Sequence, residues 1–351
     1  MAITSTKTRL KLRTLKVMKK CSIVFTALLL TGLSTQSTTV NASGVSKFIS
    51  NAVVEAAIEI EAGFSNNYAD ENTSDITVAT IELVIDSKIN DKISVHILLL
   101  HEEDETTLEV DEASISFDLE NGYSLMAGQL YLPLGNYETN MISNSLPHEF
   151  SEVRETAIQL DITSGAFTSS FYVFNGDVLE NGANDSIESM GFNIAYTTDS
   201  STFGFSFINN LSDGDLITDV ISTTVSYVSG ISIYATTTFG QTSVFFEYIS
   251  AMDEFDVADL SISTTNQKPS TLNLELGFEL KDAVFAVAYQ TSSEAVDFEL
   301  PETRFLVSYS MNLMKNTSLA FELTSDTNYS IADGGTGENA SALTTQLAIA
   351  F

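Results

Sequence analysis

From residue 53 to the end of the chain, apolar and polar residues alternate in short runs with a period of two. The clearest runs are AAIEIEAGF (56–64), MGFNIAYTT (190–198), TFGFSFINN (202–210), TLNLELGFEL (271–280) and RFLVSYSMN (304–312). In the last of these, Phe305, Val307 and Tyr309 lie on one face and Leu306 and Ser308 on the other, which is typical of a β-strand. No stretch after residue 42 has convincing helical spacing.

Twelve further runs fit the same period, at 75–89, 92–102, 108–119, 123–132, 155–163, 166–175, 219–228, 231–239, 242–250, 284–292, 317–325 and 342–351. Together they make 17 candidate strands. Because closure of a barrel by antiparallel hairpins favours an even number, we expect that one is false or two are fused, which leaves about 16 strands.

The connections between these runs differ in length. SGA (164–166), TDSS (198–201), SG (229–230) and GQ (240–241) predict tight turns, whereas 176–188, 209–219, 250–270 and 325–341 are long and acidic. This pattern predicts an all-β fold over residues 53–351: a transmembrane, antiparallel, up-and-down β-barrel with short periplasmic turns and long acidic extracellular loops.

A soluble β-sandwich would also alternate, but the two faces favour a membrane barrel. The polar faces carry Gly, Ser, Thr, Asn and Glu, which suits a water-filled lumen, and the apolar faces are rich in Phe, Leu and Tyr, which suits lipid. The chain ends LTTQLAIAF, with Leu347, Ile349 and Phe351 on one face. We interpret this aromatic-ended strand as the signal that the barrel-assembly machinery reads.

The first 42 residues have the three regions of a secretory signal peptide. A basic stretch without acids is followed by an apolar run of 13 residues (21–33) and by VNA at 40–42. Because the run is too short to span a bilayer as a helix, an uncleaved anchor is the weaker alternative. We expect cleavage after Ala42, with Met18 as an alternative start, and a short periplasmic segment at 43–52.

Removal of this segment makes the net charge of the chain more negative. Seven of the 15 basic residues and none of the 47 acids lie in it, so the chain from Ser43 carries 8 basic and 47 acidic residues, a net charge of −39. A phosphate backbone would be repelled, which excludes nucleic acid as a partner. The one cysteine, Cys21, lies in the signal, so we expect neither a disulfide nor a thiol metal site.

Catalytic motifs are absent from the sequence. The three histidines, His96, His101 and His148, are scattered, and no HExxH, GxSxG or phosphate-binding motif occurs. We therefore expect no enzyme activity, no cofactor and no metal centre. The acidic clusters DENTSD (70–75) and HEEDE (101–105) are interpreted as solvated loops, with calcium binding as the alternative.

One segment, YLPLGNYETNMISNSLPHEFSEVRETAIQL (131–160), interrupts the alternation. Pro133, Gly135 and Pro147 favour bends. Its charged residues are Glu138, His148, Glu149, Glu152, Arg154 and Glu155. In a wide barrel, a loop that folds inward narrows the lumen and sets selectivity. We predict that Leu134 to Ser151 form such a constriction and that Arg154 holds its return to the wall through a carboxylate; an ordinary surface loop is the alternative.

Four strings in and after this segment carry a family resemblance: GQLYLPLG (128–135), ETNMIS (138–143), EVRETA (152–157) and YVFNGD (172–177). Over about fifty residues the chain resembles the siderophore porins of the LbtU family. The resemblance implies a 16-stranded outer-membrane barrel that takes up ferric siderophore without a plug domain. It also implies a periplasmic amino-terminal extension of coiled-coil character, from which this chain departs because only residues 43–53 precede the first expected strand.

We therefore expect a channel in the outer membrane of a Gram-negative bacterium for uptake of a ferric siderophore or a similar iron chelate. The first alternative is a general diffusion porin that prefers cations, because a negative lumen concentrates them. The second is a structural or adhesive barrel whose acidic loops bind divalent cations. The expected partners are the small solute, outer-membrane lipid and lipopolysaccharide, and the barrel-assembly machinery.

Overall fold

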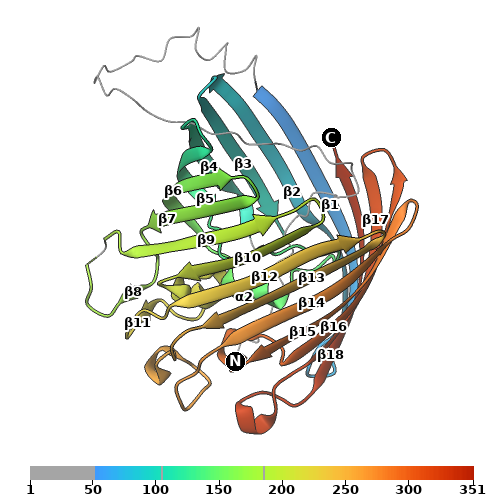
Figure 1. Ribbon diagram of the computed structural model, residues 1–351. Helices are drawn as coiled ribbons and strands as arrows, with labels where there is room; N and C mark the ends of the chain where they lie inside the picture. Colours follow the sequence, from blue (N-terminus) through green and yellow to red (C-terminus); the bar gives the residue numbers. More distant parts are fainter. Residues whose placement is uncertain (1–51, 104–105, 185) are drawn as a thin grey trace.

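A closed barrel of sixteen antiparallel strands forms the molecule (Figure 1). The computed structural model describes residues 52–103, 106–184 and 186–351. Each wall strand pairs with the next wall strand along the chain, and β1 closes the ring by pairing with β18. The expected signal peptide, the cleavage after Ala42 and the segment 43–51 lie outside the described residues.

The wall strands are β1 (Ala52–Asn66), β2 (Asn72–Asn90), β3 (Ile93–Glu102), β4 (Thr106–Asp118), β5 (Tyr123–Tyr131), β6 (Arg154–Ser164), β7 (Phe167–Phe174), β9 (Ser189–Thr197), β10 (Ser201–Ile208), β12 (Gly230–Phe239), β13 (Thr242–Ala251), β14 (Ser270–Glu279), β15 (Ala283–Ser293), β16 (Thr303–Met314), β17 (Thr317–Thr327) and β18 (Asn339–Ala350). The helices lie in the connections: α2 (Leu146–Ser151), α3 (Asp215–Thr218), η1 (Leu211–Asp213), η2 (Val257–Asp259), η3 (Val296–Phe298) and η4 (Ile331–Asp333). Among the described residues, no helix is long and apolar enough to cross a membrane.

Sixteen of the 17 candidate strands are wall strands, and the false one is 219–228. Only β11 (Thr223–Thr224) forms there, paired with β8 (Leu179–Glu180) outside the wall. Ile221 and Val228 are buried in a core that the connecting segments form with residues of the wall, so their side chains do not face lipid. The predicted turn at 229–230 is also wrong, because Ser229 ends the long connection 209–229 and Gly230 begins β12.

The other connections alternate in length as predicted. Tight turns at 91–92, 165–166, 240–241 and 315–316 lie at one end of the barrel, and the connections 132–153, 175–188, 209–229, 252–269, 294–302 and 328–338 lie at the other. The long connections therefore gather at the extracellular mouth of an outer-membrane barrel.

The outer face of the wall is apolar and its inner face carries charged residues, which is the reverse of a soluble protein. On β14, Leu274 and Leu276 are 44% and 38% exposed, whereas Glu275 between them is fully buried. On β17, Phe321 and Leu323 face outward and Glu322 between them is buried. An apolar outer face is stable only in lipid. The predicted fold class is confirmed, and a barrel with this surface belongs in the outer membrane of a Gram-negative bacterium.

The carboxyl terminus closes the wall. The backbone N–H of Ala56 donates to the carbonyl oxygen of Phe351 over 2.8 Å, and the N–H of Phe351 donates to the carbonyl of Ala56 over 2.9 Å. The side chains of Ile349 and Phe351 are exposed on the outer surface, 41% and 69% respectively. Leu347 is half-buried on the same face.

Deletion of Phe351 is expected to lower the amount of folded barrel in the outer membrane and to raise the amount of periplasmic precursor. It removes two hydrogen bonds from the seam and the outward aromatic ring. Heat-dependent gel mobility of the membrane fraction measures folded barrel, and Phe351→Tyr is the matched control that keeps a terminal aromatic. Equal amounts of folded protein from the deletion and the parent would show that this residue is dispensable.

Candidate functional site

The segment 132–153 leaves the wall after one further backbone hydrogen bond between its ends and folds into a compact loop. The N–H of Leu132 donates to the carbonyl of Val153 over 2.8 Å, which holds the two ends together. Ser145 caps α2 by accepting a hydrogen bond from the N–H of His148, and Pro147 lies in the first turn, where its missing N–H costs nothing. Of the predicted bends, Pro147 thus lies at the start of a short helix near the end of the loop.

The first docking point of this loop is a carboxylate on β13. Glu247 accepts hydrogen bonds from the backbone N–H groups of Asn136 and Tyr137, over 2.8 Å and 2.9 Å. A Cβ atom at Gly135 would lie 2.4 Å from Oε1 of Glu247. Glycine at this position therefore allows the backbone to approach the carboxylate closely.

The second docking point is Glu275 on β14. It accepts hydrogen bonds from the backbone N–H and the side-chain Nδ2 of Asn140, over 2.5 Å and 2.8 Å, and from the hydroxyl of Thr139. The carbonyl of Asn140 in turn accepts from Oγ of Ser308 on β16 over 3.1 Å. Asn140 is thus held through its backbone N–H, its carbonyl oxygen and its side chain.

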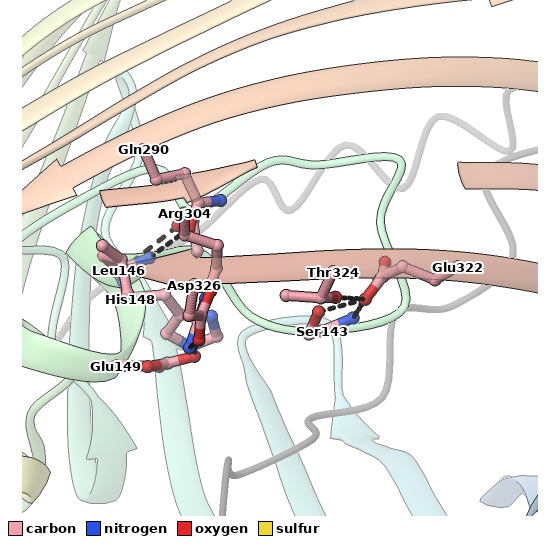
Figure 2. Close-up of polar contacts among 10 residues, drawn as sticks. Ser143, Leu146, His148, Glu149, Gln290, Arg304, Glu322, Thr324 and Asp326 are labelled. Atoms are coloured by element: carbon pink, nitrogen blue, oxygen red, sulfur yellow. Dashed lines mark hydrogen bonds and ion pairs between the residues drawn. The ribbon is translucent and has the colours of Figure 1, made fainter. Parts of the chain in front are cut away.

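The third docking point is Glu322 on β17. It accepts from the backbone N–H of Ile142 over 2.5 Å, from the N–H of Ser143 over 3.3 Å and from the hydroxyl of Ser143 (Figure 2). A net contribution on the order of 1.5–3 kcal/mol is typical of each hydrogen bond to a charged group. Three carboxylates with at least two donors each are therefore enough to fix the course of the loop.

Helix α2 is fastened next to these contacts by Arg304 of β16. Its guanidinium donates to both oxygens of Asp326, over 3.0 Å and 3.1 Å, and to Oε1 of Glu149 over 2.7 Å (Figure 2). Arg304 is only 5% exposed. Burial raises the pKa of Glu149, and the charge of Arg304 opposes that rise. The N–H of Leu146 also donates to Oε1 of Gln290 on β15 over 3.1 Å.

All five wall strands in contact with the loop present it with inward-facing side chains. On β16, for example, Arg304 and Ser308 are buried, whereas Phe305 and Val307 between them are 58% and 41% exposed on the lipid side. The loop therefore lies inside the lumen. Its hydrogen bonds run from β13 to β17, so the wall of β18, β1, β2 and β3 lies beyond the last docking point.

The apolar side of the loop packs against other connections at the same end of the barrel. Leu134, Leu146 and Phe150 are fully buried. The ring of Phe150 lies 5.7 Å from that of Phe298 in the 294–302 connection, and Phe298 lies 5.7 Å from Phe255 in the 252–269 connection. The loop is thus held between hydrogen-bonding groups of the wall and a hydrophobic core shared by several loops.

A stacked pair stiffens the loop itself. The rings of Tyr137 and His148 lie 4.5 Å apart and nearly parallel, and the hydroxyl of Tyr137 is 2.9 Å from Oγ of Ser151. Nε2 of His148 is hydrogen-bonded to Glu152. Burial raises the pKa of Tyr137 well above its usual value, so this hydroxyl stays neutral and remains a donor.

The charged residues expected at the constriction divide into two groups. Glu138, His148, Glu149 and Glu152 lie in the loop, and Glu149 docks it to the wall through Arg304. Glu155, in contrast, is in β6, near Asp177 and Asp213 of the extracellular connections.

Arg154, the first residue of β6, lies where the loop returns to the wall, and carboxylates bind it there. It shares a face of β6 with Ile158, which is 52% exposed to the lipid side, whereas Ala157 is buried on the opposite face. Its Nη1 atom donates to Glu109 over 2.9 Å and to Asp111 over 2.7 Å, both on β4. These contacts agree with the predicted carboxylate at the return of the loop, and the role of Arg154 in holding the loop stays a prediction.

The wall partners of the loop were missed because they lie more than a hundred positions away in sequence. Two signals could have found them. Arg154 and Arg304 are the two arginines after residue 42, and a cation this rare among 47 acids is expected to bind carboxylates. Glu275 and Glu322 are charged residues inside runs of lipid-facing Leu and Phe, which places them on lumen faces.

The motif residues behind the family resemblance are the docking residues of the loop. Thr139, Asn140 and Ser143 belong to ETNMIS and contact Glu275 or Glu322. In YVFNGD, a Cβ atom at Gly176 would lie within 2.5 Å of Asp213, which accepts from the N–H of Val178. Burial raises the pKa of Asp213 to about 6, against the lowering effect of its hydrogen-bond donors.

Acids in the extracellular connections are also occupied by backbone donors. Asp259 accepts from the N–H of Val225 over 3.0 Å, which joins the 252–269 connection to 209–229. Asp297 accepts from the N–H groups of Ser261 and Ile262, over 2.9 Å and 2.5 Å, which joins 294–302 to 252–269. Within the described residues no three carboxylates or imidazoles lie close enough to ligate a metal ion. These acids therefore brace the loops to one another.

Comparison with known proteins finds similar curated sequences and similar solved structures. No protein-family profile matches the chain. A UPF0422 protein of Coxiella burnetii is 27% identical over 228 residues, which cover 60% of this chain and 49% of the relative. A UPF0422 protein of Legionella pneumophila strain Paris is 22% identical over 344 residues, which cover 84% and 65%. The chain thus spans about half to two thirds of the length of these curated relatives.

Solved structures share the barrel at low sequence identity. The outer membrane channel DcaP of Acinetobacter baumannii matches with a TM-score of 0.60 and 11% identity over 86% of this chain and 97% of that one. OmpF of Salmonella typhi, in complex with daunomycin, matches with a TM-score of 0.58 and 10% identity over 86% and 98%. These likenesses establish a porin-like fold. The siderophore-porin family and the expected lack of enzyme activity stay predictions.

Replacement of Arg304 by Met is expected to destabilise the folded barrel by about 3–5 kcal/mol, because it leaves Glu149 and Asp326 buried without their countercharge. Lys92→Met is the matched control, with an expected cost of about 1 kcal/mol or less, because its ion pair with Glu120 is exposed on both sides. Urea unfolding in lipid vesicles, followed by far-ultraviolet circular dichroism, measures both. Equal losses would contradict the assignment of Arg304 as the anchor of the loop.

Proposed function

We propose that this barrel is a diffusion channel for small hydrophilic solutes with a preference for cations. The observation that carries the proposal is the position of the loop. It docks on one side of the lumen, from β13 to β17, and leaves the wall of β18 and β1–β3, with acidic residues on β1 and β3, to border the remaining opening.

The charge of the lumen supports this preference. Arg304 is neutralised by two carboxylates of its own, Glu149 and Asp326. Beyond the loop, Glu59 and Glu61 on β1 and Glu102 on β3 are on the lumen face. A low-dielectric wall with one sign of charge concentrates ions of the opposite sign and repels those of the same sign.

The resemblance to siderophore porins adds a second candidate solute, a ferric siderophore. The observation in its favour is that the shared strings coincide with the docking residues Gly135, Asn140 and Ser143, which supports a loop of the same architecture. The acidic wall would oppose a polyanionic chelate. A chelate that crosses this channel is therefore neutral or cationic.

Planar-bilayer recordings in a KCl gradient test the channel and its selectivity. We expect the current to reverse on the side of the potassium equilibrium potential. Deletion of residues 136–146 should raise the single-channel conductance, because it removes the docked part of the loop, and should keep the cation preference, because the wall is unchanged. Deletion of 332–337, in the exposed β17–β18 connection, is the control and should change neither.

Reversal at zero or on the chloride side would contradict the proposed selectivity, and an unchanged conductance after deletion of 136–146 would contradict the constriction.

Iron-limited growth of a deletion strain and its parent, with and without a purified neutral ferric siderophore, separates the two solutes. If the siderophore restores growth only in the parent, the result supports siderophore uptake through this protein. If it restores growth equally in both strains, the general porin is favoured.

A further inference from the structure

A row of lumen-facing polar residues crosses the first three strands beyond the last docking point of the loop. In register, Glu59 of β1 is opposite Thr80 of β2, and Thr80 is opposite Glu102 of β3. Residues directly opposite in antiparallel strands share a face and lie about 5 Å apart at Cβ. The three side chains are 5%, 0% and 8% exposed, whereas Ile60, next to Glu59, is 41% exposed on the lipid side.

A second carboxylate stands beside the first on the same strand face. Nε2 of Gln346 on β18 donates to Oε2 of Glu59 over 3.0 Å and to Oε1 of Glu61 over 2.8 Å. One neutral amide thus bridges two acids and uses one oxygen of each, but it cannot neutralise their charge. Glu82 lies near Glu59, and Glu322 lies near Glu61, so the surroundings add further negative charge.

Among the described residues, this pair has no countercharge. In the part of the chain that the structure describes, no Lys, Arg or His forms an ion pair with Glu59 or Glu61. Buried charges in proteins are either paired or bound to an ion. Two neighbouring carboxylates at this depth therefore require a cation from outside the described chain, or a proton.

The hydroxyl of Thr80 is a second observation, independent of the acids, that indicates a bound ligand. Its Oγ1 atom is buried and has no hydrogen-bond partner, although it lies between Glu59 and Glu102 in register. Buried hydroxyl groups are nearly always hydrogen-bonded, so an unpartnered one next to two acids is an acceptor available to a bound group.

We propose that Glu59, Glu61 and Thr80 form a binding site on the permeation path for a primary ammonium group. Three acceptors, the second oxygen of each carboxylate and the Thr80 hydroxyl, match the three N–H donors of such a group. Chelation of a bare metal ion fits less well, because among the described residues no three carboxylates or imidazoles converge. The inference rests on the proposed channel and names the class of cation that its acidic wall recognises.

Block of the potassium current in planar bilayers tests the site. The probe is 1,4-diaminobutane, and tetramethylammonium, which has a positive charge but no N–H donor, is the control ion. We expect diaminobutane to block the parent at a lower concentration than tetramethylammonium. Thr80→Val should raise the half-blocking concentration of diaminobutane roughly tenfold, the loss expected for one hydrogen bond to a charged group, and leave tetramethylammonium unchanged.

Removal of each carboxylate charge is a second test of the site. Glu59→Gln and Glu61→Gln should each weaken the block by diaminobutane and lower the potassium-to-chloride permeability ratio. Glu279→Gln, at the exposed end of β14, is the matched control and should change neither. Heat-dependent gel mobility checks that each variant is folded, and the separate substitutions keep the test valid if one of them fails to fold.

Equal block by the two ions in the parent, or block by diaminobutane that is unaffected by Thr80→Val and Glu59→Gln, would overturn the site. Either result would show that the site does not recognise the N–H donors of an ammonium group. A parent channel without cation preference would instead overturn the proposed function, so the two failures are distinguishable.

Discussion

The course of the lumen loop depends on one kind of interaction, a wall carboxylate that accepts hydrogen bonds from consecutive backbone N–H groups. A long loop inside a barrel has few secondary-structure partners for its amides, and buried amides without partners are costly. Glu247 and Glu322 each receive two neighbouring amides, and Glu275 receives an amide together with side-chain donors. Because these acids stand on rigid strands, they fix the loop where the wall places them.

The same chemistry occurs outside the lumen. Asp213, Asp259 and Asp297 accept backbone hydrogen bonds in the extracellular connections and join neighbouring loops. These acids are structural acceptors, whereas among the described residues Glu59 and Glu61 share the side-chain amide of Gln346 and have no backbone donor. The carboxylates that hold the loop therefore differ in their surroundings from the pair on β1.

The barrel could be predicted from the sequence because period-two alternation is a local property of each strand. Sixteen strands, their order and the alternation of long and short connections follow from it. The false strand at 219–228 shows the limit, because the segment alternates but its Ile221 and Val228 are buried in the core at the mouth of the barrel. The docking of the loop joins positions such as Asn136 and Glu247, far apart in sequence. The sequence marks Arg304 as one of two arginines after residue 42, but its contact with Glu149 of α2 joins residues 155 positions apart and follows only from the fold.

Hydrogen–deuterium exchange of the folded barrel in lipid nanodiscs measures the docking most directly. If the wall carboxylates hold the loop, the amides of 134–151 exchange slowly, at rates closer to those of the wall strands than to those of the exposed connection 328–338. In Glu322→Gln, protection falls around Ile142 and Ser143, while the strands keep theirs. Exchange of 134–151 in the parent as fast as that of 328–338 would contradict the account, because a loop fixed by these hydrogen bonds cannot leave its amides open to water.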